Sequence, residues 1–168
     1  MKTVLPYISL FAYAVLFSCN SKSKKDIATV PEKPKTLFTL IKPEESGITF
    51  SNTLSEDEYR NVFSYEYFYN GGGVGAGDLN NDGLTDLFFT GNLVPDRLYL
   101  NKGNFKFEDI TSKAGIEKNE GWSTGVTMAD VNQDGWLDVY VCRSGLYTDS
   151  NLQANVLYIN NKDNTFTN

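Results

Sequence analysis

Two nine-residue segments of this chain place oxygen-bearing side chains at the same alternate positions. The segments span residues 78–86 and 130–138, and both read Asp-x-Asn-x-Asp-Gly-x-x-Asp. Positions 1, 3, 5 and 9 offer carboxylate or amide oxygens, and the glycine at position 6 lets the chain turn back so that these oxygens aim at one point. Calcium prefers a flexible cage of hard oxygen ligands, whereas magnesium requires a tighter octahedron and keeps its waters. The spacing therefore predicts two calcium loops.

Each predicted site uses four side chains and the backbone carbonyl of loop position 7. The expected ligands are Asp78, Asn80, Asp82, the Leu84 carbonyl and Asp86 in the first loop, and Asp130, Asn132, Asp134, the Trp136 carbonyl and Asp138 in the second. Asp, Asn and Gly are also the commonest residues of ordinary polar turns, so one such segment alone would be weak evidence. Two copies with identical ligand spacing favour calcium binding over that alternative.

The residues that follow each loop identify the kind of calcium loop. An EF-hand needs a bidentate Glu at loop position 12 and a helix on either side, but position 12 is Phe89 in one copy and Val141 in the other. Both residues lie in aromatic and β-branched runs, at 87–89 and 139–141, which are typical of strands. The loops are therefore expected to join β-strands.

Composition limits the classes of function. The chain has 168 residues, of which 40% are hydrophobic and 14% aromatic, as in a packed globular protein. Its net charge is −6, which argues against nonspecific nucleic-acid binding because that draws on Lys and Arg. The sequence contains no His, which excludes Ser/His/Asp and Cys/His catalysis and His-ligated zinc. Carboxylate pairs remain able to act on sugars, but the best clustered carboxylates are those of the two loops.

The N-terminal residues resemble an export signal with a lipid-attachment site. Residues 3–18 are apolar behind a single Lys2, and the stretch is short for a membrane-spanning helix, which needs about 20 residues. Its Leu-x-Ser-Cys ending is similar to a bacterial lipobox, so we expect a signal peptide at 1–18 and acylation of Cys19; a plain signal peptide or an uncleaved anchor is the alternative. Residues 19–35 are polar and indicate a flexible tether. Cys142, the other Cys, is expected to be a buried strand residue.

The similarity between the two halves extends beyond the loops. Residues 98–101, Leu-Tyr-Leu-Asn, correspond to residues 157–160, Leu-Tyr-Ile-Asn. Each copy therefore predicts four short antiparallel strands in about 50 residues, the pattern of a propeller blade, with blades at about 70–112 and 121–168. A β-sandwich is the structural alternative, but it would not predict a periodic loop. Further strands are expected earlier, at 36–41 and 47–52.

The loops and the glycine-rich segments before them resemble FG-GAP/VCBS repeats. The segments are 69–77, Tyr-Asn-Gly-Gly-Gly-Val-Gly-Ala-Gly, and 121–126, Gly-Trp-Ser-Thr-Gly-Val. These are integrin-type propeller units, in the version found in bacterial envelope proteins that often carry a downstream ASPIC/UnbV segment. The resemblance covers roughly residues 37–168 and implies that the same loop residues bind calcium. Propellers of this family have about seven blades, so the resemblance implies an all-β chain holding two blades of an incomplete propeller.

Two classes of function follow from these observations. We expect a non-enzymatic, calcium-stabilised propeller module that binds or scaffolds an unidentified protein or glycan and is held by its lipid in the bacterial cell envelope, at the outer membrane. The alternative is the N-terminal part of a propeller-based, polysaccharide-acting enzyme whose catalytic residues lie downstream. Aromatic residues Trp122, Trp136 and those at 65–69 could stack on a sugar, although packing within or between blades is the commoner fate of such rings.

Overall fold

The computed structural model describes residues 36–116, 121–145 and 149–168. The chain divides into two units, Met1–Thr39 and Leu40–Asn168, and the described helices and strands all belong to the second unit. The predicted signal peptide, the tether and Cys19 lie outside the described residues. No helix in the described parts of the chain is long and apolar enough to span a membrane.

The first repeat forms one four-stranded antiparallel sheet. Its strands are β1 (Val74–Gly77), β2 (Asp86–Phe89), β3 (Arg97–Asn101) and β4 (Phe107–Asp109), and each pairs with the next strand in the chain. Short connections join consecutive strands, which is why neighbours in sequence become neighbours in the sheet.

The second repeat forms a sheet of the same order. It contains β5 (Trp122–Ala129), β6 (Asp138–Ser144), β7 (Val156–Asn160) and β8 (Phe166–Thr167). Helix α3 (Ser150–Gln153) lies in the connection between β6 and β7. The prediction of an all-β chain with two four-stranded, blade-like units is therefore confirmed. Cys142 lies in β6 as expected, but it is half-buried rather than buried.

The prediction of strands at 36–41 and 47–52 was wrong. The structure has no strand among residues 36–73, and α2 (Pro43–Ser46) lies between the two expected segments. Proline at the first helical position favours the turn, and Gly47, with φ of 80°, ends it in the left-handed conformation. Residues after Gly47 then contact the first sheet through side chains: Phe50 stacks on Phe89 with ring centroids 5.1 Å apart.

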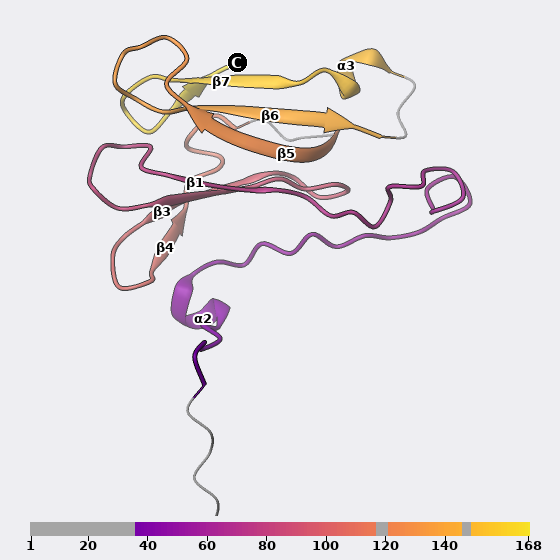
Figure 1. Ribbon diagram of the computed structural model, residues 1–168, viewed down its shortest axis with the longest axis horizontal. Coiled ribbons are helices and arrows are strands. Elements are labelled where there is room, and N and C mark those ends of the chain that lie inside the picture. Colours follow the sequence, from indigo (N-terminus) through magenta and orange to yellow (C-terminus); the bar gives the residue numbers. More distant parts are fainter. Residues whose placement is uncertain (1–35, 117–120, 146–148) are drawn as a thin grey trace, which may run out of the picture. The chain divides into compact units, whose positions relative to one another are not determined.

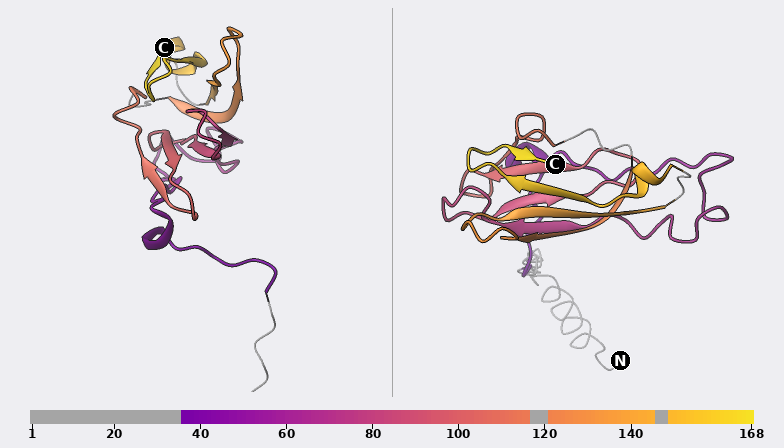
Figure 2. Two further views of the ribbon diagram at one scale, coloured as in Figure 1. Left: turned by 90° about the vertical axis from the view of Figure 1, so that its left-hand side faces the viewer. Right: turned by 90° about the horizontal axis from the view of Figure 1, so that it is seen from above.

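The main core lies between the two sheets, which Figures 1 and 2 show stacked within this unit. Its aliphatic and aromatic side chains come from both repeats, and the rings of Phe88 and Tyr158 approach to 6.4 Å between centroids. The buried members are Leu79, Phe88, Leu98, Leu100, Ile110, Ala114, Ile116, Val139, Val141, Val156, Tyr158 and Phe166. Each sheet thus buries its apolar face against the other, as blades of a propeller do.

Glycines in β1 let the second repeat approach closely. A Cβ atom on Gly77 would lie 2.8 Å from Leu137 and 2.9 Å from the Met128 sulfur, distances that real side chains do not tolerate. A Cβ on Gly75 would lie 3.2 Å from Met128. The alternation of glycine in this strand is therefore explained by the close approach of β1 and β5.

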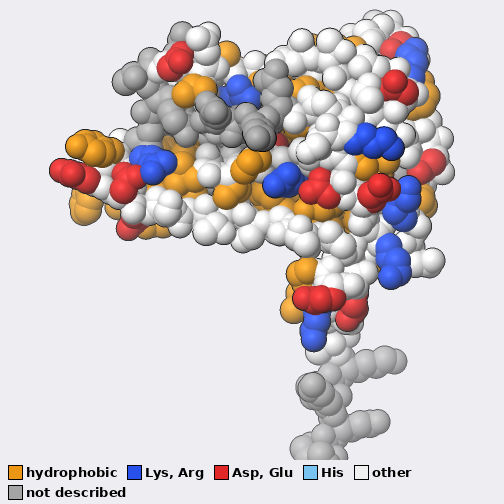
Figure 3. Space-filling view, turned by 180° about the vertical axis from the view of Figure 1, so that it is seen from behind, with side chains coloured by type: hydrophobic (Ala, Val, Ile, Leu, Met, Phe, Trp, Pro, Cys, Tyr) orange, Lys and Arg blue, Asp and Glu red, His pale blue; other side chains and the backbone are white. Residues whose placement is uncertain are grey.

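The aromatic residues before β1 divide into a packed group and an exposed group. Phe68 is buried and its ring lies 5.3 Å from that of Trp122, while Tyr65 contacts Trp122 edge to face at 5.4 Å. Tyr59, Phe63, Tyr67 and Tyr69 remain exposed in the connection. Figure 3 shows hydrophobic and acidic side chains side by side at the left edge of the molecule. Trp122 is therefore packed against neighbouring rings, as expected, whereas four of the six aromatic residues from Tyr59 to Tyr69 face solvent.

Candidate metal centre

Both predicted calcium loops connect the first two strands of a sheet. Residues 78–85 link β1 to β2, with Asp86 as the first residue of β2. Residues 130–137 link β5 to β6 in the same way, and Asp138 begins β6. The expectation that these loops join strands rather than helices is confirmed.

The two loops have the same backbone conformation. Loop positions 4 and 6 are left-handed in both copies: φ is 57° at Asn81 and 83° at Gly83, and 61° at Gln133 and 84° at Gly135. A left-handed residue costs little at Gly and is tolerated by Asn, which is why the sharp turn falls at position 6. The chain turns back as the sequence spacing predicts.

The carboxylate at position 1 organises each turn. Asp78 accepts hydrogen bonds from the backbone N–H groups of Asp82, at 3.1 Å, and Gly83, at 2.8 Å. Asp130 accepts the equivalent bonds from Asp134, at 3.0 Å, and Gly135, at 2.8 Å. These contacts fold the loop around its first carboxylate and leave each oxygen a second lone pair for a cation.

Positions 3 and 5 also repeat their contacts. The side-chain oxygen of Asn80 accepts the Asp82 amide hydrogen at 3.1 Å, and Asp82 accepts the Leu84 amide hydrogen at 2.8 Å. In the second loop, Asn132 and Asp134 accept the corresponding bonds at 3.1 and 3.0 Å. The side chains of positions 1, 3 and 5 are therefore all turned toward the inside of the curve formed by the loop backbone.

Position 9 is the buried end of each loop. Asp86 is fully buried, and its two oxygens accept the backbone N–H groups of Leu79, at 2.9 Å, and Asn101, at 2.8 Å. Burial raises the pKa of Asp86, the two N–H groups oppose this shift, and the nearby Asp82 and Asp78 carboxylates add to it. Asp138 accepts the matching bonds from Val131, at 3.1 Å, and Asn160, at 2.8 Å. Position 9 thus ties each loop to the third strand of its own sheet.

Two asparagines join the loops to the sheets, and the sequence analysis assigned no role to them. The Asn101 side chain donates to the Thr85 carbonyl at 2.9 Å, and the Asn160 side chain donates to the Leu137 carbonyl at 3.0 Å. Their signal in the sequence was the repeated Leu-Tyr-x-Asn motif at 98–101 and 157–160. Periodicity located these residues, but the pattern did not indicate that they hold position 8 of a loop.

A single charge distinguishes the two loops. The Lys162 ammonium lies 3.2 Å from the Asp134 carboxylate, whereas the first repeat has Gly103 at the corresponding place. Desolvation opposes the shift, but the Trp136 amide and Lys162 outweigh it and hold the pKa of Asp134 below its usual value. The second loop therefore has a positively charged side chain, that of Lys162 from the β7–β8 connection, beside one of its expected ligands.

The donor set fits a calcium ion better than a transition metal. Each loop presents Asp and Asn oxygens with a backbone carbonyl and no sulfur or imidazole, which is the ligand chemistry that calcium prefers. In the described parts of the chain, no group of three or more acidic or cysteine side chains is placed to hold a metal by itself. Each oxygen of the position 9 carboxylate accepts one backbone N–H group, as at position 1, and keeps a second lone pair for a cation. Calcium binding stays a prediction.

The two loops contact each other directly. The Asn81 side chain donates to the Gly135 carbonyl at 3.1 Å, and the Asn160 side chain donates to the Leu79 carbonyl at 2.8 Å. One link joins the tips of the loops and the other joins the second sheet to the first loop. The loops thus form a continuous edge along the two blades.

Comparisons with known proteins agree with this repeat architecture. Residues 67–141 match the model of the FG-GAP-like repeat. The chain is 36% identical over 72 residues to cartilage acidic protein 1 of Xenopus tropicalis and 33% identical over 72 residues to that of Homo sapiens, each match covering 42% of this chain and 11% of the relative. It is 26% identical over 129 residues to integrin alpha-8 of Gallus gallus, covering 68% of this chain and 12% of the relative. Residues 67–141 are therefore similar to FG-GAP-like repeats, and the chain spans 11 to 12% of the length of these curated relatives.

Proposed function

We propose that this chain is a calcium-binding β-propeller repeat module that binds or scaffolds other molecules and catalyses no reaction. The observation that carries the proposal is the match between the two loops, which share ligand types, left-handed positions and carboxylate-to-amide hydrogen bonds. A cation in each loop would offset the repulsion among its carboxylates and fix the loop that connects two strands.

Calorimetry and thermal unfolding test the calcium proposal. Calcium that binds only the folded chain stabilises it by about 2.7 kcal/mol per site at a hundredfold excess over Kd. We expect two sites in the wild type and one in either Asp82→Ala or Asp134→Ala. Glu44→Ala removes an exposed carboxylate outside the loops and serves as the control. Heat of binding that is absent, or a melting temperature unchanged by chelator, would refute the proposal.

We further propose that the module is exported and anchored in the bacterial envelope, in the outer membrane, by lipid on Cys19. The support is the apolar segment and lipobox-like ending of residues 3–19. Two acyl chains hold a protein stably on a bilayer, whereas one binds only marginally. The full chain should therefore sediment with membranes, and Cys19→Ala should release it or leave the signal uncleaved. Soluble wild-type protein with an intact N-terminus would contradict the anchor.

The exposed aromatic residues before β1 are the surface proposed for the unidentified protein or glycan ligand. Tyr59, Phe63, Tyr67 and Tyr69 present large rings that lose little conformational freedom on binding. Their connection is held by internal hydrogen bonds, such as those from the Tyr59 and Arg60 amides to Asp57, at 2.9 and 2.8 Å. An exposed aromatic surface of this kind suits the binding of a ligand.

A further inference from the structure

Two asparagine side chains connect the two predicted calcium loops. The side-chain amide of Asn160, at the end of β7, donates to the Leu79 carbonyl in the first loop at 2.8 Å and to the Leu137 carbonyl in the second at 3.0 Å. Asn81 of the first loop donates to the Gly135 carbonyl of the second at 3.1 Å. The two loops are therefore joined through backbone carbonyls at two places.

Each linked loop residue lies between two expected calcium ligands of its own loop. Leu79 and Asn81 are at loop positions 2 and 4, between the ligands at positions 1, 3 and 5. Gly135 and Leu137 are at positions 6 and 8, between the ligands at positions 5, 7 and 9. Because the intervening peptide units are planar and stiff, a hydrogen bond that fixes one of these residues also restricts the ligands on either side of it.

The link through Asn160 is the more rigid of the two. Asn160 is only 3% exposed, and its backbone N–H donates to the Asp138 carboxylate at 2.8 Å. Leu79 is also buried, and its backbone N–H donates to the position 9 carboxylate of Asp86 at 2.9 Å. A buried hydrogen bond cannot be exchanged for one to water, so breaking it is costly. The contact of Asn81 is exposed and is expected to be the weaker link.

The charges of each loop oppose its closure around a common centre. Each loop carries three carboxylates, which repel one another unless a cation lies between them. A loop that a cation has closed holds its linked residues in place, so the other loop loses less conformational freedom when it closes in turn. The second ion should therefore bind more tightly than it would to a loop whose neighbour is empty.

Electrostatic repulsion acts in the opposite direction. An ion in one loop weakens the negative potential that attracts an ion to the other. This effect is screened over about 8 Å at about 0.15 M salt. The buried hydrogen bonds of Asn160 are shielded from salt, so we expect the hydrogen-bonded links to decide the sign of the coupling at physiological ionic strength.

We propose that the two loops bind calcium cooperatively, and that Asn160 and, to a smaller extent, Asn81 are the positioning residues that couple them. The inference rests on the calcium binding proposed above and adds that the loops respond as one unit. Coupling between two sites is typically about 5- to 150-fold in affinity. With one buried side chain as the main link, we expect a factor of about five, and by linkage each loop raises the affinity of the other by that same factor.

Calorimetry of the full chain measures this coupling factor. Asp134→Ala disables the second loop and gives the calcium association constant of the first loop alone, and Asp82→Ala gives that of the second. The factor is the product of the two wild-type association constants divided by the product of these two single-loop constants. We expect a factor of about five in wild type, with no decrease when the salt concentration is raised.

Substitution of the linking residues should lower the factor. Asn160→Ala, measured with the same pair of single-loop substitutions, should reduce it to about one. Asn81→Gly removes the exposed link and keeps the left-handed backbone, for which φ is 57°, so it should reduce the factor in part.

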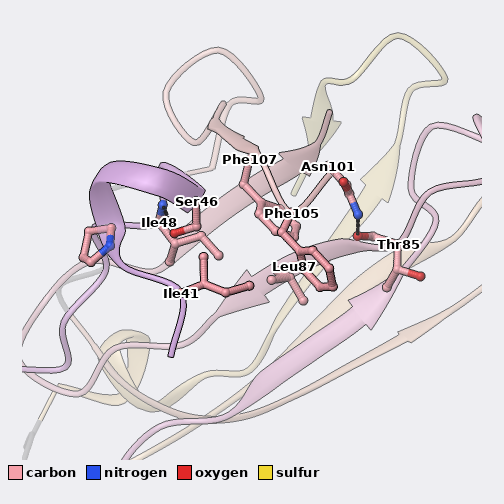
Figure 4. Close-up of a pocket in the computed structure, with 9 residues that line it drawn as sticks. Ile41, Ser46, Ile48, Thr85, Leu87, Asn101, Phe105 and Phe107 are labelled. Atoms are coloured by element: carbon pink, nitrogen blue, oxygen red, sulfur yellow. Dashed lines mark hydrogen bonds between the residues drawn. The ribbon is translucent and has the colours of Figure 1, made fainter. Parts of the chain in front are cut away.

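The counterparts of these residues in the other repeat are the matched controls. Asn101 holds the first loop through the Thr85 carbonyl, a bond that Figure 4 shows, but within the described residues it donates to no group of the second loop. Asn101→Ala should therefore lower the calcium affinity of the first loop and leave the coupling factor unchanged. Gln133→Gly, at position 4 of the second loop, should also leave the factor unchanged.

The single-loop constants separate this test from the test of calcium binding itself. Absence of binding heat from every protein would refute the calcium proposal, and this inference with it. Two occupied loops with a wild-type factor of about one or less would overturn the coupling alone. A factor that neither Asn160→Ala nor Asn81→Gly lowers, or that Asn101→Ala lowers as much as Asn160→Ala, would also overturn it. If circular dichroism shows that Asn160→Ala does not fold, Asn81→Gly against Gln133→Gly decides, because both side chains are exposed.

Discussion

Leu79 and Val131 occupy the same position in loops of the same sequence pattern, yet one is buried and the other is half exposed. The difference lies in their neighbours, because Leu79 has a following sheet to enter and Val131 has none within the described residues. In a repeat protein each unit buries its faces only against adjacent units. The same residue type therefore contributes differently to the free energy of unfolding, depending on whether a neighbouring unit covers it. Apolar residues of the repeat thus acquire their stabilising effect from the interface.

A second difference between the repeats concerns charge rather than packing. Lys162 lies beside Asp134 in the second loop, and Gly103 stands at the same place in the first. The ammonium neutralises one expected ligand and competes with a bound cation. Two loops with equal ligand spacing are therefore not expected to bind calcium equally.

The largest expected effect is on the free energy of unfolding, and it distinguishes Leu79 from Val131, the residues at position 2 of the two loops. Leu79→Ala should lower the free energy of unfolding by about 2 to 5 kcal/mol, because it opens a cavity between the sheets. Val131→Ala, at its exposed counterpart, should change it by less than about 0.5 kcal/mol. Urea unfolding followed by circular dichroism measures both. Equal losses of unfolding free energy in the two variants would contradict the conclusion that Leu79 stabilises the fold and Val131 does not.

A smaller effect is expected for the two asparagines. Asn160→Ala removes a buried side chain that bonds two carbonyls, so we expect a loss of about 1 to 3 kcal/mol. Asn101→Ala removes a half-buried side chain with one of those contacts, and its loss should be smaller by about 1 kcal/mol. The same unfolding experiment compares them, and a greater loss for Asn101→Ala would contradict the larger stabilising role that we assign to Asn160.

The smallest effect concerns calcium affinity in the second loop. Lys162→Gln removes the competing ammonium, and because the ion pair is partly exposed the gain should be below about 1 kcal/mol, or about fivefold in Kd. Calorimetry in the Asp82→Ala background isolates this loop. Lys102→Gln, whose partner Glu108 is outside the loops, is the matched control. Unchanged affinity in Lys162→Gln would mean that the lysine moves away when the cation binds.

Strands and loops were the parts of this fold that the sequence predicted well. The repeated nine-residue pattern gave the positions of both loops. The aromatic and β-branched runs that follow the loops form β2 and β6. These features are local, because loop turns depend on Gly and Asn tolerating a left-handed backbone and strands depend on apolar runs between turns. Each could therefore be read from a short window of sequence.

The segment before the first repeat could not be predicted in the same way. Apolar residues at 47–52 suggested a strand, but they contact the sheet by side chains such as Phe50, and the backbone forms no ladder. Alternating apolar residues mark which side chains are buried and do not specify whether a strand edge is available to pair with. The contact of Asn52 with Asn92, 2.7 Å between amide nitrogen and oxygen, depends on residues 40 positions apart and has no local signal.

The amino-acid sequence alone determined the two loops, their oxygen chemistry and the number of strands in each repeat, because these depend on residues within a few positions of one another. Tertiary structure decided which copies of the repeated residues became buried. Leu79 and Asn160 meet across 81 positions, while Val131 and Asn101 have the same types of neighbour in sequence and no such partner within the described residues. Burial depends on what packs against a surface. The local sequence of a repeat does not specify whether another unit covers that repeat.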